Sequence, residues 1–145
     1  MFILVAGGGK VGANLARALR RMNHEVTIIE QRRERFVQLE DQFEHAAILG
    51  DATELFVLEL AGIEEADAVV VATNGDNTNI VVGQVAQKRF GIECTVVRIL
   101  DPARAELYAT LGLRTVSPTS TAIEVLSEAV KSCAVRPVRA PAAAS

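Results

Sequence analysis

The opening of the chain constrains its fold more than any other stretch. Five apolar residues, Phe2 to Ala6, are typical of a buried parallel strand, and a helical run follows over residues 13–22. Between them the glycines fit the pattern G-x-G-x-x-G, in which a tight turn leaves the strand and backbone N–H groups approach a pyrophosphate. We therefore predict a phosphate-binding loop whose candidate residues are Gly7, Gly8, Gly9, Lys10, Val11 and Gly12.

A second predicted strand, residues 25–29, supplies the context that this glycine motif needs, because glycine-rich turns also occur for structural reasons alone. The strand ends at Glu30, 18 residues after Gly12. A carboxylate there can accept hydrogen bonds from both hydroxyls of an adenosine ribose, and it would repel a 2′-phosphate. The pattern favours NAD(H), ATP, ADP or AMP over NADP(H). The alternative is that Glu30 only ends a strand that faces water.

Composition limits the class of protein. The 145 residues fit one domain, and its formal net charge of −3 gives no general attraction for nucleic acid. The apolar opening lacks the basic region of a signal peptide, and no apolar run is long enough to span a membrane. The two cysteines, Cys94 and Cys133, have no C-x-x-C spacing, so we expect reduced core thiols in a cytoplasmic protein and no metal site.

The first helix has two expected faces. Arg17, Arg20 and Arg21 would form a solvated outer face. The inner face would be apolar and consist of Val11, Leu15, Leu19 and Met22.

Strands and helices alternate along the rest of the chain. After Glu30 we expect helices over 32–43, 54–60, 76–90, 103–111 and 118–132, and strands over 46–49, 68–72, 94–99 and 114–116. The second helix would bury Phe36, Val37, Leu39 and Phe43. Six strands separated by helices predict an α/β, Rossmann-like, doubly wound parallel sheet in the order 3-2-1-4-5-6. The domain would cover 1–134, and the Pro- and Ala-rich residues 135–145 would be a flexible tail or the start of a linker.

Polar residues follow several strands at the edge where open α/β sheets bind ligands. They comprise Asp51, Ala52 and Thr53 after the third strand, Thr73, Asn74 and Asp76 after the fourth, and Arg98 at the end of the fifth. Catalytic groups are scarce, because no Tyr-x-x-x-Lys pair exists and both histidines precede strands, at the opposite edge. We expect binding rather than turnover, with a small NAD-dependent oxidoreductase, or the cofactor half of one, as the alternative.

Six parts of the sequence form a distinctive combination. They are the glycine run, Glu30, Gly50-Asp51-Ala52-Thr53, Ala72-Thr73-Asn74 with Asp76 and Asn79, residues 98–102 and Ser117-Pro118. Together they resemble the N-terminal domain of TrkA-type potassium-transport regulators. This is the RCK or KTN domain, and the likeness covers residues 1–133. The resemblance implies a cytoplasmic regulatory domain that binds NAD(H), ATP or ADP, forms dimers or a ring, and gates a membrane-embedded potassium transporter or channel.

The resemblance also implies a role for each matching residue. The glycines would face the phosphates, Glu30 the adenosine ribose, and Asp51, Ala52 and Thr53 the adenine. Thr73, Asn74 and Asp76 would line the far end, and Arg98 would reach phosphate or only pair with a nearby acid. Lys10 stands where relatives often carry an arginine for a γ-phosphate; it would contact phosphate or remain solvated.

The sequence departs from the family pattern in two places. Thr119 replaces an acid that helps some relatives to bind a divalent cation, so a cation site is doubtful there. The second domain of most relatives is also missing, which suggests a truncated chain or a stand-alone subunit.

Surplus apolar residues on the last helix predict a partner, with the same helix region of a second subunit as the candidate. They are Ala122, Ile123, Val125, Leu126, Ala129, Val130 and Cys133. Ile80 is a second candidate for an exposed contact.

Overall fold

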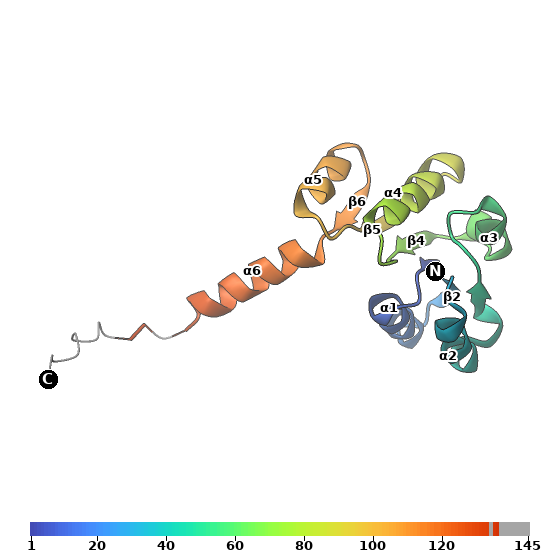
Figure 1. The fold of residues 1–145 in the computed structure, drawn as a ribbon, viewed down its shortest axis with the longest axis horizontal. Helices are drawn as coiled ribbons and strands as arrows, with labels where there is room; N and C mark the ends of the chain where they lie inside the picture. Colours follow the sequence, from blue (N-terminus) through green and yellow to red (C-terminus); the bar gives the residue numbers. More distant parts are fainter. Residues whose placement is uncertain (134, 137–145) are drawn as a thin grey trace, which may run out of the picture.

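The computed structural model describes residues 1–133 and 135–136 and confirms the predicted sheet. Six parallel strands lie in the order β3-β2-β1-β4-β5-β6, with helices packed against both faces (Figure 1). The strands are β1 (Phe2–Ala6), β2 (Glu25–Glu30), β3 (Ala47–Leu49), β4 (Ala68–Val71), β5 (Cys94–Arg98) and β6 (Arg114–Val116). The α-helices are α1 (Lys10–Arg21), α2 (Arg33–Phe43), α3 (Leu55–Leu60), α4 (Asp76–Gln84), α5 (Pro102–Thr110) and α6 (Pro118–Lys131).

The centre of the sheet decides where the ligand edge lies. Ala6 at the end of β1 pairs with Ile29 on one side and with Val71 on the other, so these three strands end level with one another. β1 is buried almost throughout, as expected for a strand covered on both faces. The loops that follow β1, β2 and β4 therefore meet at one edge, where the chain order reverses.

Small residues form the buried face of α1. Of the expected large residues, Leu19 packs partly buried against the core and Leu15 is half-buried, but the expectation is wrong for Val11 and Met22. The helix starts inside the glycine motif, at Lys10, and buries Gly12, Ala13 and Ala16. Val11 and Met22 are instead exposed. Small side chains allow the helix axis to approach the sheet closely, which a row of large residues would prevent.

Arg20 and Arg21 of α1 are exposed, as expected, and Arg17 is half-buried, but two of the three arginines also contact α2. Arg17 Nε donates to Gln42 Oε1 over 2.6 Å, and Arg20 Nη1 donates to the Gln42 carbonyl over 2.9 Å. The Arg20 guanidinium also lies 4.9 Å from the centre of the Phe43 ring. These contacts fasten α1 to the end of α2.

Three other expectations about burial need correction. On α2, Leu39 and Phe43 are buried and Phe36 is partly buried, but Val37 is exposed. Ile80 on α4 is buried in the core and is not an exposed contact, whereas its neighbour Val81 is exposed. Cys94 is half-buried, whereas Cys133 is exposed and is not a core thiol.

Three short helical segments accompany the α-helices. A π-helical turn, Val85–Arg89, extends α4, and 3-10 turns at Glu44–Ala46 and Ile63–Glu65 precede β3 and β4. Ser117 Oγ accepts the Ser120 N–H at the start of α6, as the Ser-Pro sequence predicts.

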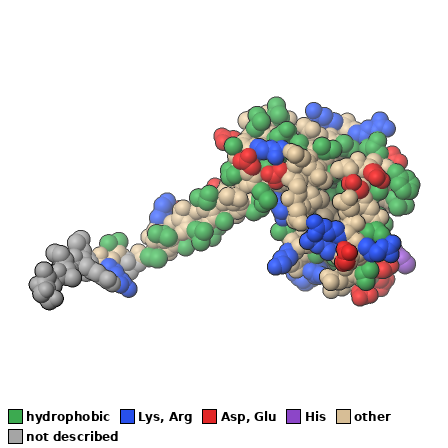
Figure 2. All heavy atoms as spheres, in the orientation of Figure 1, with side chains coloured by type: hydrophobic (Ala, Val, Ile, Leu, Met, Phe, Trp, Pro, Cys, Tyr) green, Lys and Arg blue, Asp and Glu red, His purple; other side chains and the backbone are tan. Residues whose placement is uncertain are grey.

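The last helix, α6, extends away from the body of the molecule (Figure 1). None of its residues between Pro118 and Lys131 is buried, so its apolar side chains are exposed along its length (Figure 2). The predicted tail 135–145 lies outside the described residues, apart from 135–136. None of the helices in the described part of the chain is long and apolar enough to cross a membrane.

Candidate functional site

One pocket of about 210 Å³ lies at the carboxyl edge of the central strands. It contains seven of the residues singled out from the sequence, namely Gly7, Gly9, Glu30, Asp51, Ala52, Thr73 and Asn74. The loops after β1, β2, β3 and β4 each contribute to its wall. The sheet topology therefore brings together residues that are far apart in the sequence.

The glycines of the first loop have different roles. Gly7 has φ +107°, and a Cβ there would lie 2.7 Å from the Ala72 carbonyl oxygen. A Cβ on Gly12 would lie 1.8 Å from the Gly7 oxygen, so only glycine at this position allows the helix to pack against the loop. A Cβ on Gly9 would meet only the end of the Arg35 side chain, at 3.3 Å. Gly7 and Gly12 thus serve the fold, whereas the backbone of Gly9 lies open to the pocket.

Glu30 is held rigidly at the centre of this edge. Its side chain is only 5% exposed, so it does not simply end a strand that faces water. Oε2 accepts the Gly8 N–H over 2.7 Å, and Oε1 accepts the Arg32 N–H over 2.9 Å. The carboxylate therefore orders the glycine loop and the start of α2, and each oxygen keeps capacity to accept a further hydrogen bond.

Asp51 and Ala52, which follow β3, also line the pocket. Asp51 Oδ1 accepts both the Thr53 N–H over 2.9 Å and the Thr53 hydroxyl over 2.7 Å. Thr53 is not among the lining residues. It fixes the turn that presents Asp51 to the pocket.

The fourth wall depends on a residue that the sequence did not single out as part of the site. Asn79 is 0% exposed, and its Oδ1 accepts the N–H and the hydroxyl of Thr73. Its Nδ2 donates to the carbonyl oxygens of Thr73 and Arg98, over 3.0 Å and 2.9 Å. Asn79 thereby joins the ends of β4 and β5. Its spacing with Val82, Gly83 and Ala86 was a usable signal, since these positions share the buried face of the helix.

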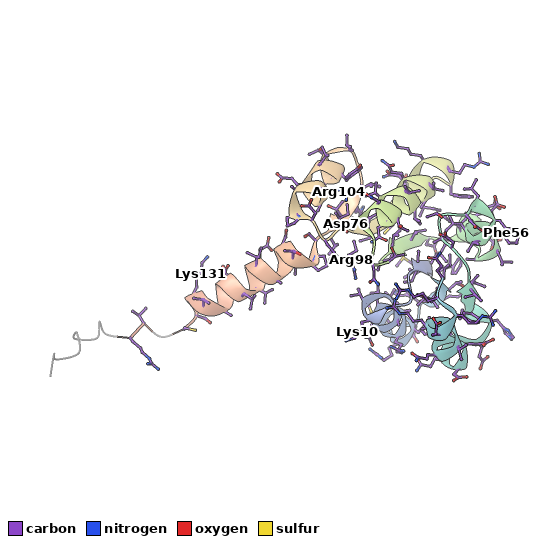
Figure 3. The ribbon with its side chains drawn as sticks, viewed as in Figure 1. Lys10, Phe56, Asp76, Arg98, Arg104 and Lys131 are labelled. Atoms are coloured by element: carbon purple, nitrogen blue, oxygen red, sulfur yellow. The ribbon has the colours of Figure 1, made fainter. Side chains whose placement is uncertain are left out.

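Asp76 and Arg98, which are labelled in Figure 3, are not among the residues that line this pocket. The Asp76 carboxylate accepts the N–H groups of Leu100, over 2.8 Å, and Asp101, over 3.2 Å, and so secures the loop before α5. The Arg98 Nε is buried and has no hydrogen-bond partner among the described residues. Any contact of these two side chains with a ligand stays a prediction.

The remaining candidates lie beside the pocket. Gly8 and Lys10 line a neighbouring groove between α1 and α2, whereas Val11 and Gly12 belong to the first turn of α1 and line neither. Among the described residues, no group of three or more His, Cys, Asp or Glu side chains is placed to hold a metal ion.

The pocket residues that were not singled out from the sequence include Gln31, Arg32 and Arg35. All three follow β2, whose end the sequence had already placed at the ligand edge. The available signal was therefore the run of three arginines at positions 32, 33 and 35, directly after Glu30.

Comparison with known proteins places the chain in a family. Residues 3–118 match the family model of the TrkA-N domain. The Trk system potassium uptake protein TrkA of Streptomyces coelicolor is 40% identical over 117 residues, which are 81% of this chain and 52% of that protein. The chain thus spans about half the length of the curated relatives that it matches.

Two solved structures share the fold. GsuK bound to ADP has a TM-score of 0.75 at 24% identity, covering 90% of this chain and 34% of GsuK. The Kef CTD of Shewanella denitrificans in its AMP-bound form has a TM-score of 0.73 at 23% identity, covering 90% of this chain and 80% of that one. The match to the family model and the identity to TrkA go further than the fold: this chain belongs to the TrkA-N domain family.

Proposed function

We propose that this chain is a regulatory domain that binds an adenine nucleotide, NAD(H), ATP or ADP, in the pocket at the carboxyl edge of the sheet. The observation that carries the proposal is the open backbone of Gly9 in the same pocket as the buried carboxylate of Glu30. This pair matches what a diphosphate and an adenosine ribose require. The ADP-bound and AMP-bound states of the two structural neighbours agree with it.

Each wall would hold a different part of the ligand. The loop of Gly7, Gly8 and Gly9 would hold the phosphates, and Glu30 would accept hydrogen bonds from the ribose. Adenine would lie against Asp51 and Ala52, with the second ribose, nicotinamide or terminal phosphate near Thr73 and Asn74. Three of the other candidates would act by shaping these walls, namely Gly12, Thr53 and Arg98, and Asp76 would secure the loop before α5.

We assign the domain to a potassium uptake system, with a membrane-embedded transporter or channel as its partner on the cytoplasmic side. The name of the Streptomyces coelicolor relative supports this assignment. Nucleotide exchange would change the contacts between subunits and so alter the state of the transporter. In this role the nucleotide is a signal and is not consumed.

Self-association through α6 is part of the same proposal. Ile123, Val125, Leu126 and Val130 are all more than half exposed on a helix that has no buried residue. Such a helix has little to stabilise it within one chain, because packing of an apolar face supplies most helix stability. A second copy would cover these side chains.

The decisive experiment is calorimetric titration of ADP, ATP, NAD⁺ and NADH into the chain and into a Gly9→Val variant. Gly9 has φ −75°, and only the flexible end of Arg35 lies near its missing side chain, so the variant should fold. The new side chain would occupy the place of the phosphates. We expect at least one nucleotide to bind the unmodified chain with micromolar affinity and to lose about tenfold or more in the variant.

Ala109→Val is the matched control, because it adds similar bulk at an exposed position of α5, away from the pocket. Equal nucleotide affinity in all three proteins, or no binding to any of them, would contradict the proposal. Steady consumption of NADH with a carbonyl substrate would favour the oxidoreductase alternative instead.

A further inference from the structure

The two faces of the sheet are covered to different extents. One face packs on α3, α4 and α5, which contribute Leu58, Val82 and Ala105 to its core. The other face packs on α1 and α2, which contribute Ala16 and Leu39. The last helix, α6, has no buried residue and extends away from both faces (Figure 1). Among the described residues, the second face therefore has one covering helix fewer than the first.

Strand β5 shows where this cover is missing. It lies between β4 and β6, and an inner strand of a parallel sheet is normally buried on both faces. In β5, Thr95 and Val97 are buried, whereas Cys94, Val96 and Arg98 are only half-buried. Such alternation is typical of a sheet that is covered on one face.

The neighbouring strands continue this uncovered surface, which we call the open face. Val70 of β4 pairs with Val96, which in turn pairs with Arg114 of β6. Arg98 pairs with Val116. Residues that pair across parallel strands project from the same face of the sheet. The open face consists of Val70, Cys94, Val96, Arg98, Arg114 and Val116.

The open face is mainly apolar and contains no acidic side chain. Val116 is 47% exposed. The Nε of Arg98 is buried and has no hydrogen-bond partner among the described residues. Exposed apolar surface and an unpaired buried polar group are both unfavourable for a single copy. An apolar surface that also carries acids would suit this face.

Helix α6 has both of these properties. Ile123, Leu126 and Val130 are each more than half exposed, and Glu124 and Glu128 lie on the same helix. Its 14 residues span about 21 Å, and a helix about 10 Å wide covers about two strands. The helix is therefore long and wide enough to cover β5 and β6.

The link between β6 and α6 keeps the helix off the open face of its own copy. Ser117 is the single residue between the two elements, and it has an extended backbone. Its Oγ donates to the Leu100 carbonyl and accepts the Ser120 N–H, each over 3.3 Å. A chain reversal between a strand and a helix normally takes two or more residues. A second copy is therefore the source of a helix for this face.

We propose that α6 of one copy lies on the open face of a second copy, and that the exchange is reciprocal. Two identical contacts then form a dimer with twofold symmetry. The inference rests on the proposed self-association, and it places α6 on the sheet of the partner instead of on the partner's α6. Because the Arg98 carbonyl accepts from Asn79, this contact adjoins the network that shapes the nucleotide pocket.

Val116→Asp tests the docking site, because Val116 belongs to the open face and does not line the nucleotide pocket. Leu107→Asp is the matched control, since Leu107 is 53% exposed on α5, which covers the opposite face. Light scattering over a concentration series measures the dissociation constant of the dimer. We expect it to rise by about tenfold or more in Val116→Asp and by less than about threefold in Leu107→Asp. Circular dichroism checks that both variants are folded.

A mixture of two defective variants makes the test stricter. Val116→Asp keeps an intact α6, and the double variant Ile123→Asp/Leu126→Asp keeps an intact open face. Mixing them restores one of the two contacts, so an affinity-tagged Val116→Asp copy should retain the double variant. If two α6 helices packed against each other instead, Val116→Asp alone would stay dimeric and would not retain the double variant.

The possible failures are distinguishable. A monomeric unmodified chain would overturn the self-association and the docking site together. A dimer that survives Val116→Asp, or a mixture without retention, would overturn the docking site and leave self-association in place. Nucleotide binding is measured separately by ADP titration, so its failure would overturn the proposed nucleotide site alone.

Discussion

At the scale of single residues, the pocket owes its shape to polar side chains that are satisfied inside the protein. Asn79 is the clearest case, because its amide accepts from Thr73 and donates to the carbonyl oxygens that end β4 and β5. A buried amide with all of these partners is stabilising, whereas the same partners left alone are costly. The wall of the pocket therefore depends on a side chain that does not itself line it.

We predict that Asn79→Leu lowers the free energy of unfolding by about 3 kcal/mol, because it removes four hydrogen bonds and leaves buried backbone groups without partners. Urea denaturation measures this change. Asn77→Leu on the same helix is the control, since Asn77 is exposed and its side chain meets only Arg104. Comparable losses in both variants would show that the network around Asn79 contributes little.

The residues of the site were predictable where a backbone requirement selects them. The motif requires a tight turn at Gly7, a close helix contact at Gly12 and an acid at the end of the second strand, Glu30. Because these requirements have fixed positions in the motif, the three residues could be identified from the sequence. Asn79 was named only as part of the family resemblance, without a role, and Arg35 was not identified, because a polar residue in a polar stretch gives the same pattern whether its side chain is buried, faces a ligand or is solvated. Only the packing of the loops distinguishes these cases.

At the scale of elements, the sequence predicted the positions of the helices better than it predicted which face of each helix is buried. The alternation of strands and helices predicts the sheet order, because short right-handed crossovers leave few other topologies. The inner face of α1 could not be predicted from hydrophobic periodicity, which gives weight to large residues such as Val11 and Met22. The requirement for close approach to β1 selected Ala13 and Ala16 instead.

Ala16 provides the test of this close approach. It is fully buried between α1 and the sheet, so Ala16→Leu should overfill the contact and lower the free energy of unfolding by about 2 kcal/mol or more. Met22→Ala, at a position 64% exposed near the end of the same helix, should change it by less than about 0.5 kcal/mol. Thermal or urea unfolding distinguishes the two, and a neutral Ala16→Leu would mean that α1 can move away from the sheet.

At the scale of the whole molecule, a compact α/β body and an extended helix are joined at Ser117 (Figure 1). The sequence predicted the surplus of apolar residues on this helix, because they occupy more of its circumference than one contact face needs. It did not predict that no face would pack on the chain's own body, since that depends on the direction in which the helix leaves β6. The result is an apolar arm that is well suited to contact a second copy.

The arm gives a prediction about the size of the particle in solution. Ile123 and Leu126 are 57% and 65% exposed and stand one turn apart, so they share a face of α6. Replacing both with aspartate would place two charges in the proposed contact between copies, where their desolvation is unfavourable. We expect light scattering to show a multimer for the unmodified chain and a monomer for the double variant at the same concentration.

Val37→Asp is the control, because Val37 is a similarly exposed apolar residue of α2, at 52%. Since the arm contributes no residue to the pocket, ADP titration of the double variant should still show binding. A multimer that survives the double change would place the contact on another surface.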